Sequence, residues 1–221
     1  MITIHKSDGA AFAEILKTQR AKAYTQGPVY EQIREDFHGK CYLCEDDEPT
    51  QIQIEHHNPH QGDLVKQFDW NNLFYSCGHC NGIKGAHYWP LLNCTRPEQR
   101  VWESLRMEWQ VFPKTSVTLS LREGCPDREM GENTLRLLNK ILNGANATPM
   151  QQDQAKSLRK KIQRANDQLS QAIERRDDEA ILACLQDSAP FAGLLRWRFY
   201  LEFPAHWARL NLTERFSLQL G

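Results

Sequence analysis

The chain has 221 residues, and its 27 basic and 28 acidic side chains give a net charge of −1. Hydrophobic residues make up 40%, which allows a packed core and excludes wholesale disorder. No run of about 18 apolar residues and no apolar N-terminal segment is present, so we expect neither a membrane span nor a signal peptide, and a cytoplasmic protein. Seven cysteines, an odd number, favour free thiols and metal binding over disulfides.

Two helices are predicted before the first cysteine pair. Residues 10–25 place Phe12, Ile15 and Leu16 on one face, and Gly27-Pro28 ends this helix. A second helix is predicted over residues 28–37, with Gly39 as its C-cap. It leads directly into Cys41.

Two C-x-x-C pairs follow, and four thiolates can complete one tetrahedral zinc site. The ligands are predicted to be Cys41, Cys44, Cys77 and Cys80. His38 is a weaker candidate ligand, because four cysteines already close the site. The isolated Cys94, Cys125 and Cys184 are expected to be ordinary buried or half-buried side chains.

Between the pairs, residues 51–56 alternate polar and apolar and predict a strand, residues 57–69 a loop, and residues 72–76 the returning strand. A helical segment is predicted to start near Asn81. His60, His79 and His87 are expected to be surface residues, although His60 is close enough to touch a substrate.

The remainder is predicted to be largely helical. Helices are expected from Pro97 through Trp109, over residues 134–142 and 149–176, and after Asp177 and Ser188, with a short strand over residues 117–121. The basic residues of the long helix can contact phosphate or a partner, or form a solvated face; they are Lys156, Arg159, Lys160, Lys161 and Arg164. The aromatic segment 191–203 is expected to pack in the core rather than stack on bases.

A motif of about 45 residues covers the cysteine-bounded segment: an acidic residue followed by His and Pro, a central Asn-Leu, a C-x-x-C, then Asn and Lys. In this chain these are Glu55, His56, Pro59, Asn72-Leu73, Cys77, Cys80, Asn81 and Lys84. On these residues the segment resembles the HNH endonuclease family, which has a ββα-metal fold. Glu55 replaces the more common Asp or His, Asn81 replaces a His, and His57 stands where an apolar residue is usual.

The resemblance implies hydrolysis of phosphodiester bonds. His56 suits the role of general base, with His57 as the competing candidate because neighbouring strand residues face opposite ways. Glu55 and Asn81 offer oxygen ligands for a catalytic Mg²⁺ or Mn²⁺. Asn72 is expected to orient the hairpin and the His56 ring, and Lys84 to contact phosphate or brace the helix. The zinc would be structural.

The N-terminal helices, the motif and the helical tail together are similar to the PtuB family, the HNH nuclease subunits of Septu anti-phage systems, some of which are attached to retrons. This resemblance implies a PtuA-like ABC/SMC-type ATPase as a partner, and in retron systems a reverse transcriptase with its multicopy DNA. The low net charge agrees with a partner that helps to hold nucleic acid.

The expected fold is α+β and mostly helical, with a zinc-stapled ββα-metal core. Residues 1–94 would hold the N-terminal helices and the nuclease core, and residues 95–221 a helical region for packing and partner binding. Two other functions remain open from the sequence. The chain can be a stand-alone restriction or repair nuclease, although it has few clustered basic residues, or a non-catalytic zinc module that binds nucleic acid.

Overall fold

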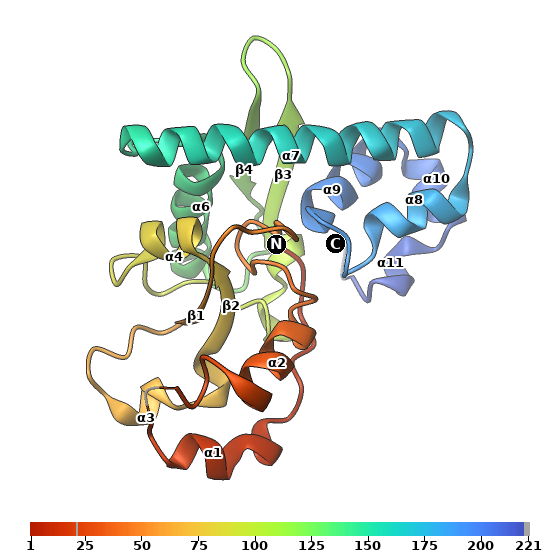
Figure 1. Ribbon diagram of the computed structural model, residues 1–221. Helices are drawn as coiled ribbons and strands as arrows, with labels where there is room; N and C mark the ends of the chain where they lie inside the picture. The colour runs from red at the N-terminus through yellow and green to blue at the C-terminus, as the bar shows by residue number, and fades with distance from the viewer. Residues whose placement is uncertain (21, 219–221) are drawn as a thin grey trace.

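A computed structural model describes residues 1–20 and 22–218, and its fold is α+β with mostly helical elements (Figure 1). Within these residues the sheets are two small antiparallel pairs, β1 with β2 and β3 with β4. None of the described helices is long and apolar enough to cross a lipid bilayer.

The N-terminal part contains less helix than the sequence predicted. The helix expected over residues 10–25 is only η1 (Gly9–Phe12) and α1 (Ala13–Lys17), and residue 21 lies outside the described residues. The helix stops after Lys17 because Gln19 takes a left-handed backbone conformation at φ 50°, through which a right-handed helix does not continue. The second helix, α2 (Gly27–Asp36), agrees with the prediction, and Gly39 follows it at φ 68°.

The centre of the molecule is a hairpin followed by a helix. β1 (Ile52–His56) pairs with β2 (Leu73–Cys77), with Glu55 opposite Phe74 and His56 opposite Leu73. The connection contains two short turns of helix: α3 (Leu64–Gln67) lies inside the predicted loop of residues 57–69, and η2 (Trp70–Asn72) includes Asn72, which was predicted to start the returning strand. The helix α4 (Gly78–Lys84) starts three residues before Asn81 and packs on both strands.

The helix predicted from Pro97 through Trp109 is largely wrong. Only η3 (Pro97–Gln99) and α5 (Val101–Ser104) are helical, and the chain then enters β3 (Leu105–Gln110). β3 pairs with β4 (Ser116–Leu121), so Leu105 and Met107 are buried on the same face. Apolar residues at Leu105, Met107 and Trp109 also fit a strand period, and the partner strand decided between the two patterns.

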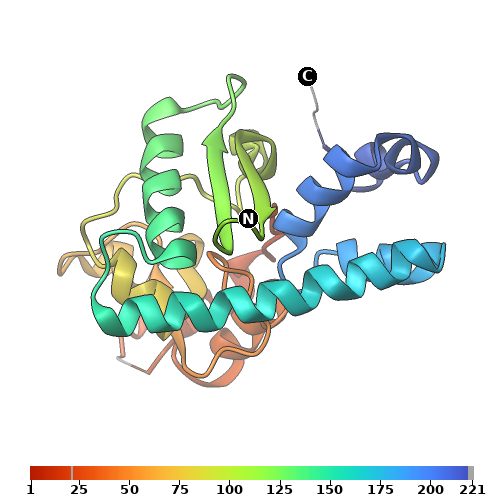
Figure 2. The ribbon, with the colours of Figure 1, turned by 90° about the horizontal axis from the view of Figure 1, so that it is seen from above.

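The C-terminal helices are α6 (Arg128–Asn143), α7 (Pro149–Glu174), α8 (Asp178–Leu185), α9 (Ala192–Glu202), α10 (Pro204–Arg209) and α11 (Leu212–Arg215). Helices α7, α8 and α9 start close to their predicted positions, whereas α6 starts six residues before the predicted Thr134, and α10 and α11 were not predicted. Gly144 ends α6 at φ 71°, and Thr148 starts α7 with a capping box that includes Gln151. Figure 2 shows α6 and the β3–β4 hairpin side by side on one side of α7.

The core contains the aromatic residues that were predicted to pack there. Trp102 and Trp197 stack with ring centroids 4.4 Å apart, and Trp102 also lies parallel to Trp207. All three rings are buried, so Trp197 of segment 191–203 is not accessible for stacking on a nucleic-acid base.

Buried polar contacts join residues 1–94 to residues 95–221. The Met1 ammonium pairs with Glu45 at 2.9 Å, and Glu45 also accepts a hydrogen bond from Gly193 N in α9 at 2.8 Å. Lys40 donates to the carbonyl of Ala189 at 2.7 Å. The cysteine-bearing loop after α2 is therefore held against the C-terminal helices. A functional division of the chain after residue 94 stays a prediction.

Candidate metal centre and catalytic site

The four predicted cysteine ligands come together in one buried cluster. Cys41 and Cys44 lie in the turn after α2, while Cys77 ends β2 and Cys80 lies in the first turn of α4. Their sulfur atoms all lie within 4.8 Å of one another. Four thiols at this spacing can hold a structural metal ion such as zinc, and they leave no ligand position for water. Within residues 1–20 and 22–218, no histidine joins this group.

The acid and the base of the predicted motif line one cavity of about 310 Å³ along the edge of β1. Glu55 and His56 come from β1, Asn81 and Lys84 from α4, and His60 from the connection between the strands. Gln53 and Glu55 share one face of the strand, and Asn81 and Lys84, three residues apart, share one face of the helix. Asn81 donates to the side chain of Gln53, and Lys84 pairs with Glu55, so these two faces are in contact.

Glu55 and Lys84 form a buried ion pair of 3.3 Å, and both side chains are only 2% exposed. The Tyr42 hydroxyl donates to the other Glu55 oxygen. Burial raises the pKa of Glu55 to about 7, against the opposing charge of Lys84. Lys84 also donates to the His56 carbonyl at 2.9 Å. Of the two roles predicted for Lys84, these contacts favour the brace between α4 and β1.

His56 is half-buried, and its hydrogen bonding leaves one ring nitrogen for chemistry. Nε2 lies 3.0 Å from the Gln67 carbonyl, which can only accept, so Nε2 carries the proton and Nδ1 is the basic nitrogen. Burial lowers the pKa of His56 below its usual value, which favours this neutral form. The ring contacts Tyr24 and His60, with centroids 5.4 and 4.5 Å away.

Asn72 fixes the connection that holds His56. Its Oδ1 accepts from Asn58 N at 2.7 Å, and its Nδ2 donates to the carbonyls of Asn58 and Lys66 at 2.9 and 2.8 Å. Lys66 precedes Gln67, whose carbonyl accepts the His56 proton. Asn72 therefore acts on the ring through the backbone of α3 rather than by direct contact.

His57, directly after β1, faces away from the His56 side and belongs to the core, where its ring centroid lies 6.3 Å from that of Tyr42, the partner of Glu55. It is 4% exposed, its Nε2 lies 3.3 Å from the Leu92 carbonyl, and its ring packs on Phe74 and Trp89. It does not line the cavity that holds Glu55, His56 and Asn81. The geometry therefore favours His56 as the candidate base.

His57 is expected to make the protein acid-sensitive. Burial lowers the pKa of His57 from 6.5 to about 3. Between these values the unfolded chain binds a proton at His57 and the folded chain does not, so stability is lost as the pH falls. The loss attributable to His57 between pH 7 and pH 5 is about 2 kcal/mol. Urea unfolding at both values should show that His57→Gln loses about 2 kcal/mol less than the unaltered protein. An equal loss in both would contradict this prediction.

Sequence reasoning missed several residues that position the site. Tyr42, Gln53 and Gln67 contact Glu55, Asn81 and His56 respectively. Strand alternation could have indicated Gln53, which lies two residues before Glu55. No sequence signal identified Tyr42 or Gln67, because each reaches the site through the tertiary fold. His79, predicted to be a surface residue, bonds to Gln154 and the Ile141 carbonyl.

Comparison with models of protein families, with curated proteins and with solved structures finds no match to this chain. The function proposed below therefore rests on the residues of this chain and their geometry.

Proposed function

We propose that this chain is a metal-dependent HNH endonuclease that hydrolyses phosphodiester bonds. The observation that carries the proposal is that the His56 ring, with Nε2 committed to Gln67, lines one cavity with Glu55 and Asn81. The β1–β2–α4 unit that presents them is joined to the cysteine cluster through Cys77 and Cys80. This combination of a base, oxygen donors and a structural metal cluster matches the chemistry that the motif implies.

The oxygen donors suit a hard divalent cation. Asn81 uses its amide nitrogen on Gln53, which leaves its Oδ1 as a donor to an ion. Each Glu55 oxygen has one partner, Tyr42 or Lys84, and keeps further lone-pair capacity. We propose that Glu55 and Asn81 hold Mg²⁺ or Mn²⁺, which would stabilise negative charge on the phosphate and the leaving oxygen.

The residues of the chain would carry the proton transfer. His56 Nδ1 would accept a proton from a water molecule as the water oxygen forms a bond to phosphorus and the bond to the leaving oxygen breaks. The Gln67 carbonyl would then stabilise the imidazolium through Nε2. Asn72, by fixing the carbonyl of Lys66, would keep Gln67 in place during this step.

We further propose that the nuclease is the effector of a Septu-type anti-phage complex with a PtuA-like ATPase, with or without a retron reverse transcriptase and its multicopy DNA. The net charge of −1 supports a partner, because a protein that binds polyanions alone usually carries excess positive charge.

The decisive experiment is a cleavage assay on the purified chain, alone and co-purified with the proposed PtuA-like ATPase. We expect plasmid DNA or RNA to be cut when Mg²⁺ or Mn²⁺ is present and to stay intact without it. The proposal would be contradicted if the folded protein, with metal bound at its four cysteines, cuts neither substrate with or without the ATPase. In that case a zinc-stabilised binding module becomes the better description.

A further inference from the structure

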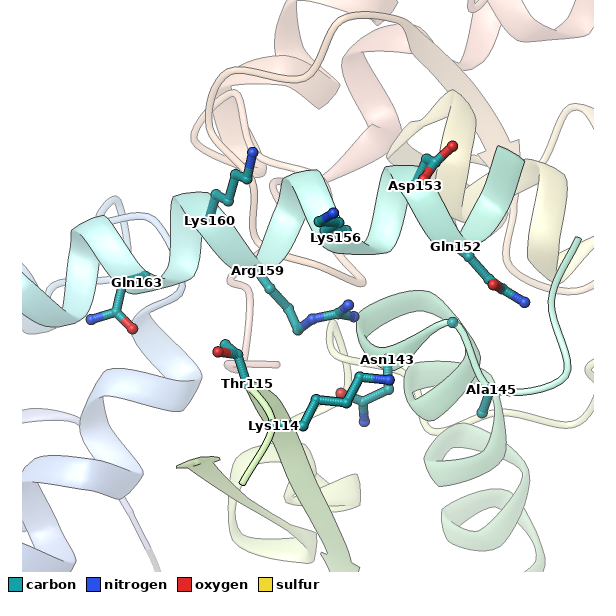
Figure 3. Close-up of a pocket in the computed structure, with 11 residues that line it drawn as sticks. Lys114, Thr115, Asn143, Ala145, Gln152, Asp153, Lys156, Arg159, Lys160 and Gln163 are labelled. Carbon is teal, nitrogen blue, oxygen red and sulfur yellow. The ribbon is translucent and has the colours of Figure 1, made fainter. Parts of the chain in front are cut away.

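A cavity of about 770 Å³ lies away from the candidate catalytic site. It is a cleft between the end of the β3–β4 hairpin, the turn from α6 to α7, and one face of α7 (Figure 3). The cationic residues of its lining are Lys114, Lys156, Arg159 and Lys160. Asp153 is the only acidic lining residue within the described part of the chain. In a protein of net charge −1, this is a local concentration of positive charge.

The positive charges come from two walls. Lys114 belongs to the hairpin, and Lys156 and Arg159 belong to α7. Figure 3 shows Arg159 reaching from α7 toward Asn143 and Lys114, whereas Lys160 and Asp153 extend from the outer side of the helix. Lys114 and Lys156 are exposed and have no ion-pair partner among the residues the structure describes. Both can therefore neutralise a bound anion.

The walls are fixed to each other by hydrogen bonds. Asn143 at the end of α6 exchanges two bonds with the backbone of Val117 in β4, of 2.9 and 2.8 Å. Trp109 of β3 donates to Gln163 of α7 at 3.2 Å, and Arg159 donates to the Leu142 carbonyl at 2.6 Å. A ligand would therefore enter a cleft that is already formed, which lowers the ordering cost of binding.

An exposed aromatic residue lies in the same hairpin turn as Lys114. Phe112 lies in the hairpin turn two residues before Lys114, and its side chain is 89% exposed. Its neighbour Val111 is 63% exposed. In Figure 1 this turn projects beyond α7. A positively charged groove next to an open aromatic ring is the combination by which proteins hold single-stranded nucleic acid, through phosphate contacts and base stacking.

We propose that this cleft binds the sugar–phosphate backbone of a single-stranded nucleic acid and that Phe112 stacks on one of its bases. The cleft would hold a strand outside the catalytic cavity, through Lys114 and Lys156 on its two walls and Arg159 between them. The proposal deepens the proposed function, on which it rests for the choice of nucleic acid as the anion.

Binding is tested with the full-length His56→Ala protein, so that cleavage does not interfere. A short fluorescein-labelled single strand, as DNA and as RNA, is titrated at several salt concentrations, with the matching duplex in parallel. In Lys114→Glu/Lys156→Glu, the slope of log affinity against log salt should become shallower by about 1.4, because each single-strand phosphate contact contributes about 0.7. Phe112→Ala should weaken single-strand binding roughly tenfold and leave duplex binding unchanged.

The matched control is Arg175→Glu/Arg176→Glu, which reverses two exposed charges at the other end of α7, about 28 Å from Lys156 along the helix axis. It should keep the affinity and the slope, and thermal melting should show that both double variants fold. An unchanged salt slope in Lys114→Glu/Lys156→Glu overturns the proposal. It is also overturned if the protein binds the duplex more tightly than the single strand and Phe112→Ala changes neither affinity.

The binding and cleavage results separate this inference from the proposed function. If single-strand binding depends on the cleft residues but the unaltered protein never cuts nucleic acid, the binding site is supported and the proposed nuclease activity is refuted. If Lys114→Glu/Lys156→Glu cuts in the presence of metal as fast as the protein with both lysines, and the same change leaves strand affinity unaltered, the nuclease activity is supported and the binding site in the cleft is refuted.

Discussion

His56→Ala is expected to abolish cleavage while leaving the fold and the cysteine-bound metal in place. His56 is half-buried, and the contacts it loses are the Gln67 carbonyl and the rings of Tyr24 and His60. The Lys84 bond to its carbonyl does not depend on the side chain. Removal of a general base costs about 10²–10⁴-fold in rate. Single-turnover cleavage rates, together with metal content and thermal melting, measure both parts of the expectation.

Two neighbouring histidines are the controls. His60→Ala removes a ring from the same cavity without removing the proposed base, and His57→Gln replaces the buried competitor with a side chain that can still donate to the Leu92 carbonyl. Both should keep measurable cleavage at temperatures where they are folded. Wild-type cleavage in His56→Ala together with an inactive, folded His57→Gln would reverse the assignment. Full activity in His56→Ala, His57→Gln and Glu55→Ala alike would remove catalysis from this site.

Cys41→Ala is expected to lose the metal and to unfold the N-terminal half or make the protein insoluble. The cluster joins the turn after α2 to β2 and α4, so its loss releases the hairpin that carries Glu55 and His56. Structural zinc in small domains contributes apparent free energies of about 10–16 kcal/mol, much of it folding free energy. Elemental analysis should find one zinc per unaltered chain and none in the variant.

A cysteine outside the cluster is the matched control. Cys184→Ala changes a half-buried thiol of α8 and should keep the metal and nearly all of the stability. A strong zinc chelator should lower the melting temperature of the unaltered protein and of Cys184→Ala alike. Native protein that is purified without metal and melts at the same temperature with and without chelator would refute the structural metal site.

Lys84 illustrates why a motif residue needs its tertiary surroundings. The sequence allowed it to contact phosphate or to brace the helix. In the structure it is 2% exposed, paired with Glu55 and bonded to the His56 carbonyl. An ammonium in that position costs too much desolvation to remain without partners, and Glu55 supplies the opposite charge. The side chain therefore connects α4 to β1.

The sequence by itself determined the features that depend on local signals. The paired cysteines indicated the cysteine cluster that can hold a metal ion, and Thr148-Pro149 and Gly144 marked the start of α7 and the end of α6. Alternation of polar and apolar residues located β1, because a strand with one buried face has a period of two residues.

Only the tertiary structure decided which side of β1 is the core. Alternation separates His56 from His57, but the buried side is set by α4 and by the segment that carries Trp89 and Leu92. The strand at Leu105–Gln110 likewise depended on its partner β4, because its apolar residues fit a helix as well as a strand. The basic residues of α7 were visible in the sequence, but the cleft also needs the hairpin that carries Lys114, and only tertiary contacts bring that hairpin to α7. In each case the deciding interaction joins residues far apart along the chain, and local periodicity carries no information about such contacts.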